Sequence, residues 1–122
     1  MHKILICEDE PELLDTLESL IEAKLSASEI YKAANGLDGF ILAQKEKFDL
    51  IITDHKMPFM TGAAFIIGVR TRENLNKTTP FLMLSGFIDE QLRKNLSIQQ
   101  VHFMEKPLTP DDFLQVIRTF LL

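Results

Sequence analysis

The sequence predicts an α/β domain built on an open, doubly wound parallel sheet of five strands. The first observation is a regular alternation, repeated five times, of a short apolar run with a longer amphipathic stretch. The second is that the first, third and fourth apolar runs are nearly continuous, as in parallel strands that helices cover on both faces. The third is that 122 residues, 46% of them hydrophobic, suffice for one buried core and leave no room for a second domain.

The five apolar runs are the expected strands. They span residues 3–7, 30–33, 49–53, 81–84 and 101–104, and the second run is the weakest. Because strands connected by helical crossovers run parallel, the carboxyl ends of all five strands are expected at one edge of the sheet.

The amphipathic stretches are the expected helices. They span residues 11–25, 36–46, 62–70, 89–96 and 110–122. Pro11 and Pro110 suit the first helical position, where a missing N–H costs nothing. Asn35, Thr61 and Thr109 are plausible N-caps, because their side chains can accept a hydrogen bond from the first helical turn.

Apolar spacing indicates which helix faces meet the sheet. In the second helix we expect Leu37, Phe40 and Ile41 to face inward. The last helix carries a clear stripe, which consists of Phe113, Val116, Ile117 and Phe120. Leu114, Leu121 and Leu122 stand beside that stripe, so we expect them to widen the apolar surface of this helix.

Charge and composition exclude several classes of function. Thirteen Lys and Arg against eighteen Asp and Glu give a net charge of −5, which argues against binding to nucleic acid. The single cysteine, Cys7, excludes an internal disulfide and a cysteine-cluster metal site. No apolar run approaches the roughly 18–20 residues that a membrane span needs, and the first residues do not form a signal peptide. We therefore expect a cytoplasmic domain.

Polar side chains gather where the apolar runs end. In doubly wound sheets, ligands bind outside the carboxyl ends of the strands. The side chains expected there are Glu8, Asp9, Glu10, Asp54, Ser85, Glu105 and Lys106. Several carboxylates, a hydroxyl and a lysine are therefore expected on one rim.

These side chains suggest a site for a cation and a phosphoryl group. Two carboxylates 4 Å apart repel by about 4 kcal/mol at an effective dielectric constant of 20, so the cluster must bind a proton or recruit a cation. An all-oxygen ligand set suits Mg²⁺ or Mn²⁺ better than zinc. Lys106 and Ser85, placed beside such a metal, can hold an oxyanion with three acceptor oxygens.

Four segments together resemble the signature of bacterial two-component response-regulator receiver domains, of the chemotaxis-regulator type. They are residues 4–11, which end in Glu8-Asp9-Glu10-Pro11, residues 54–62, Leu84-Ser85-Gly86 and Glu105-Lys106-Pro107. The resemblance covers essentially all 122 residues. It implies a flavodoxin-like (β/α)5 fold with strand order 2-1-3-4-5, and a single receiver domain over residues 1–122.

The resemblance assigns a role to each residue of the rim. It makes Asp54 the phosphoacceptor, which takes a phosphoryl group from a histidine kinase or a histidine phosphotransfer protein. Glu8, Asp9 and Asp54, with the backbone carbonyl of Lys56, would hold Mg²⁺. Ser85 would be the switch hydroxyl and Lys106 the cation on the phosphoryl oxygens, with a cis Lys106–Pro107 bond.

The resemblance also suggests residues that affect switching and the lifetime of the phosphoryl group. Phe103 stands at the switch-aromatic position, where many family members have Tyr. Phe has no hydroxyl to bond the loop after Ser85, so a ring turned inward could be stabilised only by packing. Alternatively, Phe103 is an ordinary half-buried strand residue. Lys56 and Phe87 lie two residues beyond Asp54 and Ser85. We hypothesise that their side chains shield the phosphoryl group from water; alternatively, both point into solvent.

By the resemblance, the chain is a signalling protein that catalyses only its own phosphorylation and dephosphorylation. Hydrogen bonds from Ser85 and Lys106 to the phosphoryl group would sum to roughly 3–6 kcal/mol. A shift of a two-state equilibrium from 1:99 to 99:1 needs about 5.5 kcal/mol. An output partner or a second copy would dock on the fourth helix, fifth strand and fifth helix, where Leu114, Leu121 and Leu122 favour docking over scattered surface leucines. The chain would be a stand-alone receiver or one cut from a longer protein.

Three other functions fit the same architecture less well. A phosphatase of the haloacid-dehalogenase type needs a second carboxylate two residues after its nucleophile, where Lys56 follows Asp54 here. A flavin carrier needs a small-residue phosphate loop after the first strand, where Glu8-Asp9-Glu10 would repel a phosphate. A degenerate receiver that binds partners without phosphate is disfavoured, because the residues of the site are all present.

Overall fold

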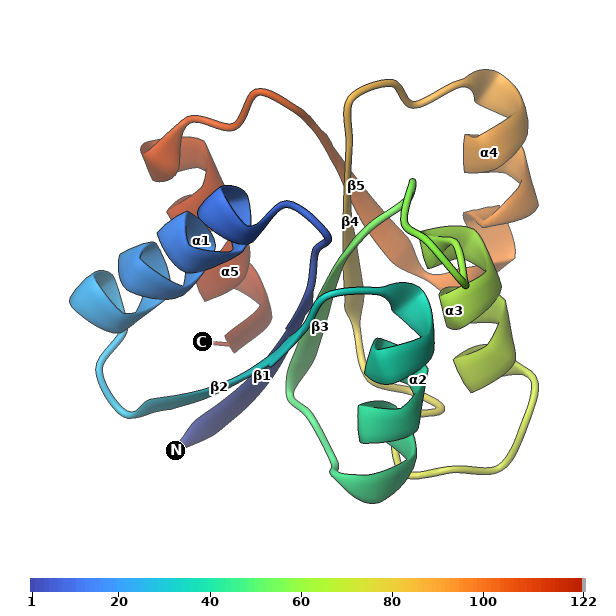
Figure 1. Cartoon of the computed structure of the whole chain (residues 1–122), viewed down its shortest axis with the longest axis horizontal. Helices are drawn as coiled ribbons and strands as arrows, with labels where there is room; N and C mark the ends of the chain where they lie inside the picture. Colours follow the sequence, from blue (N-terminus) through green and yellow to red (C-terminus); the bar gives the residue numbers. More distant parts are fainter. Residues whose placement is uncertain (122) are drawn as a thin grey trace.

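The computed structural model describes residues 1–121 and has the predicted doubly wound α/β fold (Figure 1). The five strands are β1 (His2–Cys7), β2 (Ser28–Ala33), β3 (Leu50–Asp54), β4 (Phe81–Ser85) and β5 (Val101–Glu105). The helices are α1 (Pro11–Lys24), α2 (Gly36–Lys45), α3 (Gly62–Arg70), α4 (Glu90–Asn95) and α5 (Pro110–Leu121), with a short 3₁₀ turn, η1 (Ser97–Gln99), before β5. All neighbouring strands are parallel and their order is β2-β1-β3-β4-β5, as the sequence predicts.

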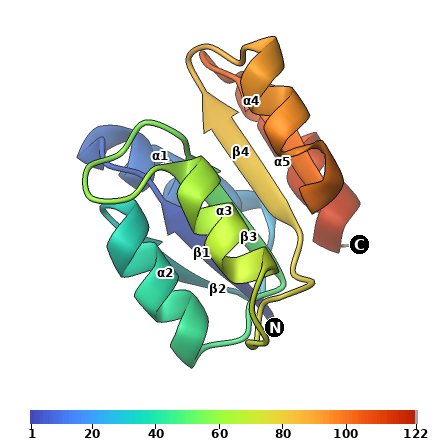
Figure 2. The same cartoon turned by 90° about the vertical axis from the view of Figure 1, so that its right-hand side faces the viewer.

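Helices cover both faces of the sheet. Helices α1 and α5 lie on one face, and α2, α3 and α4 lie on the other (Figures 1 and 2). Side chains of β1 alternate between the two cores, because successive residues of a strand point to opposite faces. Ile4 and Ile6 pack under α1 and α5, whereas Leu5 and Cys7 pack under α2 and α3. In the part of the chain that the structure describes, no helix is both long and apolar enough to span a bilayer.

The predicted helix starts are confirmed. Pro11 and Pro110 occupy the first positions of α1 and α5. The predicted caps accept hydrogen bonds from the first helical turn: Asn35 from Asp38 N–H at 2.8 Å, Thr61 from Ala64 N–H at 3.1 Å and Thr109 from Asp112 N–H at 3.2 Å. These caps lie near the carboxyl ends of the strands, so they fix where the helices start at this edge of the sheet.

The predicted inward face of α2 is confirmed for Phe40, which packs against the core on the side of α2 and α3, and is wrong for Leu37 and Ile41. Leu37 and Ile41 are each 42% exposed, and Phe40 is half-buried beside Gly68 of α3. The buried residues of the helix are instead Gly36, which faces Met60 of the loop after β3, and Gly39 and Ala43, which face the core. A Cβ on Gly39 would lie 2.6 Å from the Cys7 sulfur, so α2 approaches β1 too closely for a larger side chain. Apolar spacing alone does not reveal a face made of glycine and alanine.

The predicted widening of the apolar surface on α5 is also corrected. Leu114 is only 5% exposed and belongs to the core under α1 and α5. Leu121 is half-buried and packs against the same core, while Leu122 lies outside the described residues. These leucines therefore do not support a docking face on α5. Cys7 is the inert core residue that its position predicts, because burial raises the pKa of its thiol to about 12.

Two glycines of α3 offer a matched test of how closely the loop after β3 is held. A Cβ on Gly62 would lie 2.1 Å from the backbone oxygen of Asp54, whereas one on Gly68 would meet only the flexible ring of Phe40 at 3.0 Å. We predict that Gly62→Ala lowers the free energy of unfolding by about 2 kcal/mol or more. Gly68→Ala should change it by no more than about 1 kcal/mol, because helix propensity offsets the ring movement. Urea unfolding followed by circular dichroism measures both, and equal effects would contradict the close approach.

Candidate functional site

Three carboxylates meet at the carboxyl ends of β1 and β3. The two strands are direct neighbours, with Cys7 opposite Thr53, so the residues that follow them lie side by side. Glu8, Asp9 and Asp54 each offer an oxygen atom, and these atoms all lie within 4.8 Å of one another. Glu8 is 1% exposed and Asp54 7% exposed, whereas Asp9 faces solvent. Two of the three negative charges are therefore largely removed from water.

Lys106 neutralises part of this charge. Its ammonium donates to Glu8 Oε1 and to Asp54 Oδ2, each at 3.1 Å. Burial alone lowers the pKa of Lys106, but the hydrogen bonds and charges of the two carboxylates outweigh it and raise that pKa. The lysine is therefore charged at neutral pH and bridges the ends of β1 and β3.

One positive charge does not balance the cluster. Burial and the nearby charge of Asp54 raise the pKa of Glu8 to about 7, although the Glu10 N–H and Lys106 oppose the shift. A carboxyl group with such a raised pKa gains from a bound cation, which would favour its ionised form. The ligand atoms on offer are all oxygen, and such sets suit Mg²⁺ or Mn²⁺. The residues present therefore fit the predicted metal.

The two oxygens of Asp54 have different partners. Lys106 binds Oδ2, and the His55 backbone N–H donates to Oδ1 at 2.7 Å. This backbone contact was not predicted, because sequence patterns do not show where a turn aims its N–H groups. The carboxylate is held in one orientation at the mouth of the site.

The hydroxyl of Ser85 is buried and already has partners. Ser85 is 3% exposed at the end of β4. Its hydroxyl donates to the Phe87 carbonyl oxygen at 2.8 Å, and the Phe87 N–H approaches it at 3.4 Å. Ser85 thus holds the start of the loop that leads into α4.

A cleft of about 270 Å³ opens above these groups. It is lined by Asp9, Glu10, Asp54, Lys56, Ser85, Gly86, Phe87 and Lys106. Of the predicted site residues, Glu8 lies beneath it, bound to Lys106. The Lys56 side chain is exposed and the Phe87 ring is 70% exposed, so both stand at the mouth. The predicted cis Lys106–Pro107 bond is present beside it.

Phe103 does not line the cleft. It is half-buried on β5 and packs against the core on the side of α2, α3 and α4. The guanidinium of Arg93, from α4, lies 5.0 Å from the centre of its ring. Phe103 therefore contacts α4 directly, and this cation–π contact was not predicted from the sequence.

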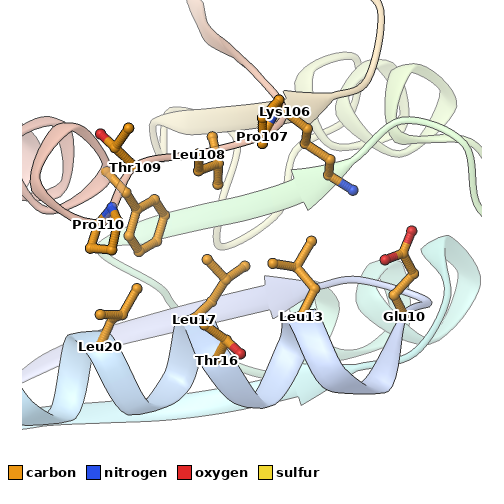
Figure 3. A pocket seen from close by; sticks show the side chains of 11 residues that line it. Glu10, Leu13, Thr16, Leu17, Leu20, Lys106, Pro107, Leu108, Thr109 and Pro110 are labelled. Carbon is orange, nitrogen blue, oxygen red and sulfur yellow. The ribbon is translucent and has the colours of Figure 1, made fainter.

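An apolar groove of about 310 Å³ runs from the site between α1 and the loop before α5 (Figure 3). Leu13, Leu17 and Leu20 of α1 point toward Leu108 of that loop and Pro110 at the start of α5. Glu10 and Lys106 face each other at the end near the carboxylates (Figure 3). The sequence reveals the α1 stripe, but it does not show that part of this stripe lines a groove.

Known proteins resemble this chain over almost its whole length. The family model described as "Response regulator receiver domain" matches residues 4–118. The transcriptional regulatory protein CusR of Escherichia coli K12 is 34% identical over 122 residues, which are 98% of this chain and 51% of CusR. Hybrid signal transduction histidine kinase G of Dictyostelium discoideum is 32% identical over 120 residues, which are 97% of this chain and 4% of the kinase. The chain thus spans about half or less of the length of these relatives.

A solved structure has the same fold. The chemotaxis response regulator CheY4 of Vibrio cholerae superposes with a TM-score of 0.86 at 28% sequence identity, over 98% of each chain.

The crowded charge of the site predicts opposite effects of Glu8→Gln on stability and on metal binding. The raised pKa means that unfolded Glu8 ionises near pH 4.5 but folded Glu8 only near 7. Ionised Glu8 therefore destabilises the fold progressively as the pH rises through this range, and fully above it. In metal-free buffer at pH 8, Glu8→Gln should raise the Tm by several degrees, and this gain should shrink toward pH 5.

Addition of MgCl₂ should reverse the order. Bound Mg²⁺ stabilises the folded wild type by mass action, and less so the variant that lacks one carboxylate. Thermal unfolding with EDTA or with MgCl₂ measures both effects. A variant that is less stable than the wild type at pH 8 without metal would contradict the charge crowding.

Proposed function

The chain belongs to the response regulator receiver domain family, and we propose that Asp54 is its phosphoacceptor. Receiver domains act in two-component phosphorelay signalling, and the relatives include a response regulator and a hybrid histidine kinase. They are signalling proteins rather than enzymes of metabolism. We propose further that residues 1–122 form a single receiver domain and that this domain acts in the cytoplasm.

The observation that carries this proposal is the environment of the Asp54 carboxylate. It stands buried at the end of a central strand, with a lysine on one oxygen and a backbone N–H on the other. In the proposed reaction, an Asp54 oxygen attacks the phosphorus of a phosphohistidine. The new O–P bond forms as the P–N bond breaks, and the electron pair of that bond stays on the imidazole nitrogen. The two contacts hold the Asp54 carboxylate in one orientation for this attack.

We propose that Glu8, Asp9 and Asp54 bind Mg²⁺ or Mn²⁺, with the Lys56 backbone carbonyl as a further ligand. The spacing of the three carboxylates supports this set. When bound, the metal supplies positive charge that offsets the negative charge of the phosphoryl oxygens in the transition state. Lys106 adds a second positive charge at the same place, since its ammonium already contacts Asp54.

Ser85 and Phe103 are the proposed switch. A phosphoryl group on Asp54 offers acceptor oxygens that draw the Ser85 hydroxyl away from the Phe87 carbonyl. The loop after β4 is then released at its first residues, and it leads directly into α4. The contact of Arg93 with the Phe103 ring links α4 to β5, so a movement of α4 would change the contacts of the Phe103 ring.

The proposed partners dock at two places. A histidine kinase or histidine phosphotransfer protein delivers the phosphoryl group, and the apolar groove of Leu13, Leu17 and Leu20 suits its approach because it opens beside Lys106. An output partner or a second copy of the chain docks on the face of α4, β5 and α5, where the switch acts. No nucleic acid is proposed as a ligand of this domain, in keeping with its net charge of −5.

The first test of this function is phosphorylation by a small donor. Incubation with acetyl phosphate and Mg²⁺ should add one phosphoryl group, seen by mass spectrometry, and EDTA should prevent it. Asp54→Asn should abolish the addition. Asp49→Asn is the matched control, because Asp49 precedes β3 at the opposite edge of the sheet. No addition to the wild type, or persistent addition to Asp54→Asn, would overturn the proposal.

The second test concerns the lifetime of the phosphoryl group. If the Lys56 ammonium and the Phe87 ring shield the mouth of the cleft, Lys56→Asn and Phe87→Ala should each speed dephosphorylation several-fold. The Phe87 carbonyl, which binds Ser85, remains in the alanine variant. Loss of phosphate is followed after removal of the donor, with Lys45→Asn at the far end of α2 as a control. Unchanged rates would mean that both side chains merely face solvent.

A further inference from the structure

Phe59 has a backbone conformation that does not suit its side chain. Its φ is 70°, in the left-handed region, and the Met60 N–H donates to the Pro58 carbonyl oxygen at 2.8 Å across it. Three-residue turns of this hand are rare and strained. Residues other than Gly, Asn and Asp seldom adopt this φ, because the Cβ crowds the backbone. The chain therefore places one of its bulkiest side chains where glycine or asparagine would be more stable.

The Phe59 ring does not contribute to the packing of the described residues. The side chain is 83% exposed, more than any other aromatic side chain among the described residues. It belongs to neither core cluster and to none of the ring pairs of the structure. An exposed ring in a strained conformation is costly, and such outliers gather at functional sites.

The residues around Phe59 are held firmly. Met57 is buried in the core under α2 and α3, and Met60 packs against the same core. The Met60 carbonyl lies so close to Gly36 that a Cβ there would be 2.0 Å from its oxygen. The Gly62 N–H donates to the His55 carbonyl at 2.8 Å and closes the base of the loop. The ring is thus presented on a fixed turn, which keeps the entropic cost of binding low.

This turn stands on the rim of the proposed phosphorylation site. The loop begins at Asp54 and returns to it, since a Cβ on Gly62 would lie 2.1 Å from the Asp54 carbonyl oxygen. Figures 1 and 2 show the loop between β3 and α3 projecting beyond the carboxyl ends of the strands. The other strongly exposed ring, Phe87, follows the neighbouring strand β4 at the same rim.

We propose that Phe59 is a specificity-determining contact for the protein that donates the phosphoryl group. Its ring packs against an apolar surface beside the donor's phosphohistidine. This inference rests on the proposed function, because a donor protein must bring its phosphohistidine to Asp54 across the rim on which Phe59 stands. Rigid aromatic side chains of this kind dominate the binding energy of many interfaces.

The test compares a protein donor with a small donor. The variants are Phe59→Asn, which removes the ring and suits the left-handed φ, and Phe59→Tyr, which keeps an aromatic ring. The matched control is Leu75→Asn, because Leu75 is 50% exposed in the segment that leads to the opposite edge of the sheet. The protein donor is a phosphorylated histidine phosphotransfer domain, chosen from a panel because it phosphorylates the wild type. The small donor is acetyl phosphate.

We expect kcat/KM for the protein donor to fall about tenfold or more in Phe59→Asn, mainly through KM. Phe59→Tyr and Leu75→Asn should stay within about twofold of the wild type. The rate with acetyl phosphate should not change in any variant, and the Tm of Phe59→Asn should equal or exceed that of the wild type.

Three results would overturn the inference. Equal transfer from the protein donor to Phe59→Asn and the wild type would show that the ring makes no contact. An equal loss with acetyl phosphate would place Phe59 in the chemistry instead. A lowered Tm of Phe59→Asn would show that the ring serves the fold. Failure of acetyl phosphate to modify Asp54 in the wild type would instead defeat the proposed function.

Discussion

The arrangement of the site depends on one constraint, the crowding of buried negative charge at the ends of β1 and β3. Glu8 and Asp54 are almost fully buried, and the single ammonium of Lys106 lies 3.1 Å from each. Like charges this close are tolerated only with a compensating cation or a proton. The pKa of Glu8, raised to about 7, shows that Lys106 does not compensate fully. Under the proposed function, the site therefore needs further positive charge before it accepts a phosphoryl group.

The parallel sheet makes this crowding unavoidable. The register sets Cys7 against Thr53 and Asp54 against Leu84, so the residues after β1, β3 and β4 reach the same rim. The helices that begin there are held by caps and by close glycine contacts, such as that of Gly62 with Asp54. Strand order, and not sequence proximity, brings together groups that are nearly one hundred positions apart in the chain.

The sequence predicted what depends on local pattern and on strand ends. The caps at Asn35 and Thr61 and the rim of Glu8, Asp54 and Lys106 were foreseen from these patterns, whereas the strand order was implied by the family resemblance. The close packing of Gly36, Gly39 and Ala43 in α2 was not foreseen, because glycine and alanine carry no apolar signal although close packing needs them. The turn at Phe59 was also missed, since a left-handed φ at phenylalanine contradicts the residue preferences that such predictions use.

The structure also changes the energetics of the proposed switch. Hydrogen bonds from Ser85 and Lys106 to a phosphoryl group would contribute roughly 3–6 kcal/mol if both donors were otherwise free. Neither is free, because Ser85 donates to the Phe87 carbonyl and Lys106 donates to two carboxylates. The free energy that drives the switch is therefore the difference between two arrangements in which both donors are hydrogen-bonded, and it is smaller than that sum. A complete shift, which needs about 5.5 kcal/mol, then requires a further contribution. Under the proposed function, binding of an output partner to the active arrangement would supply one, and phosphorylation and partner binding would then reinforce each other.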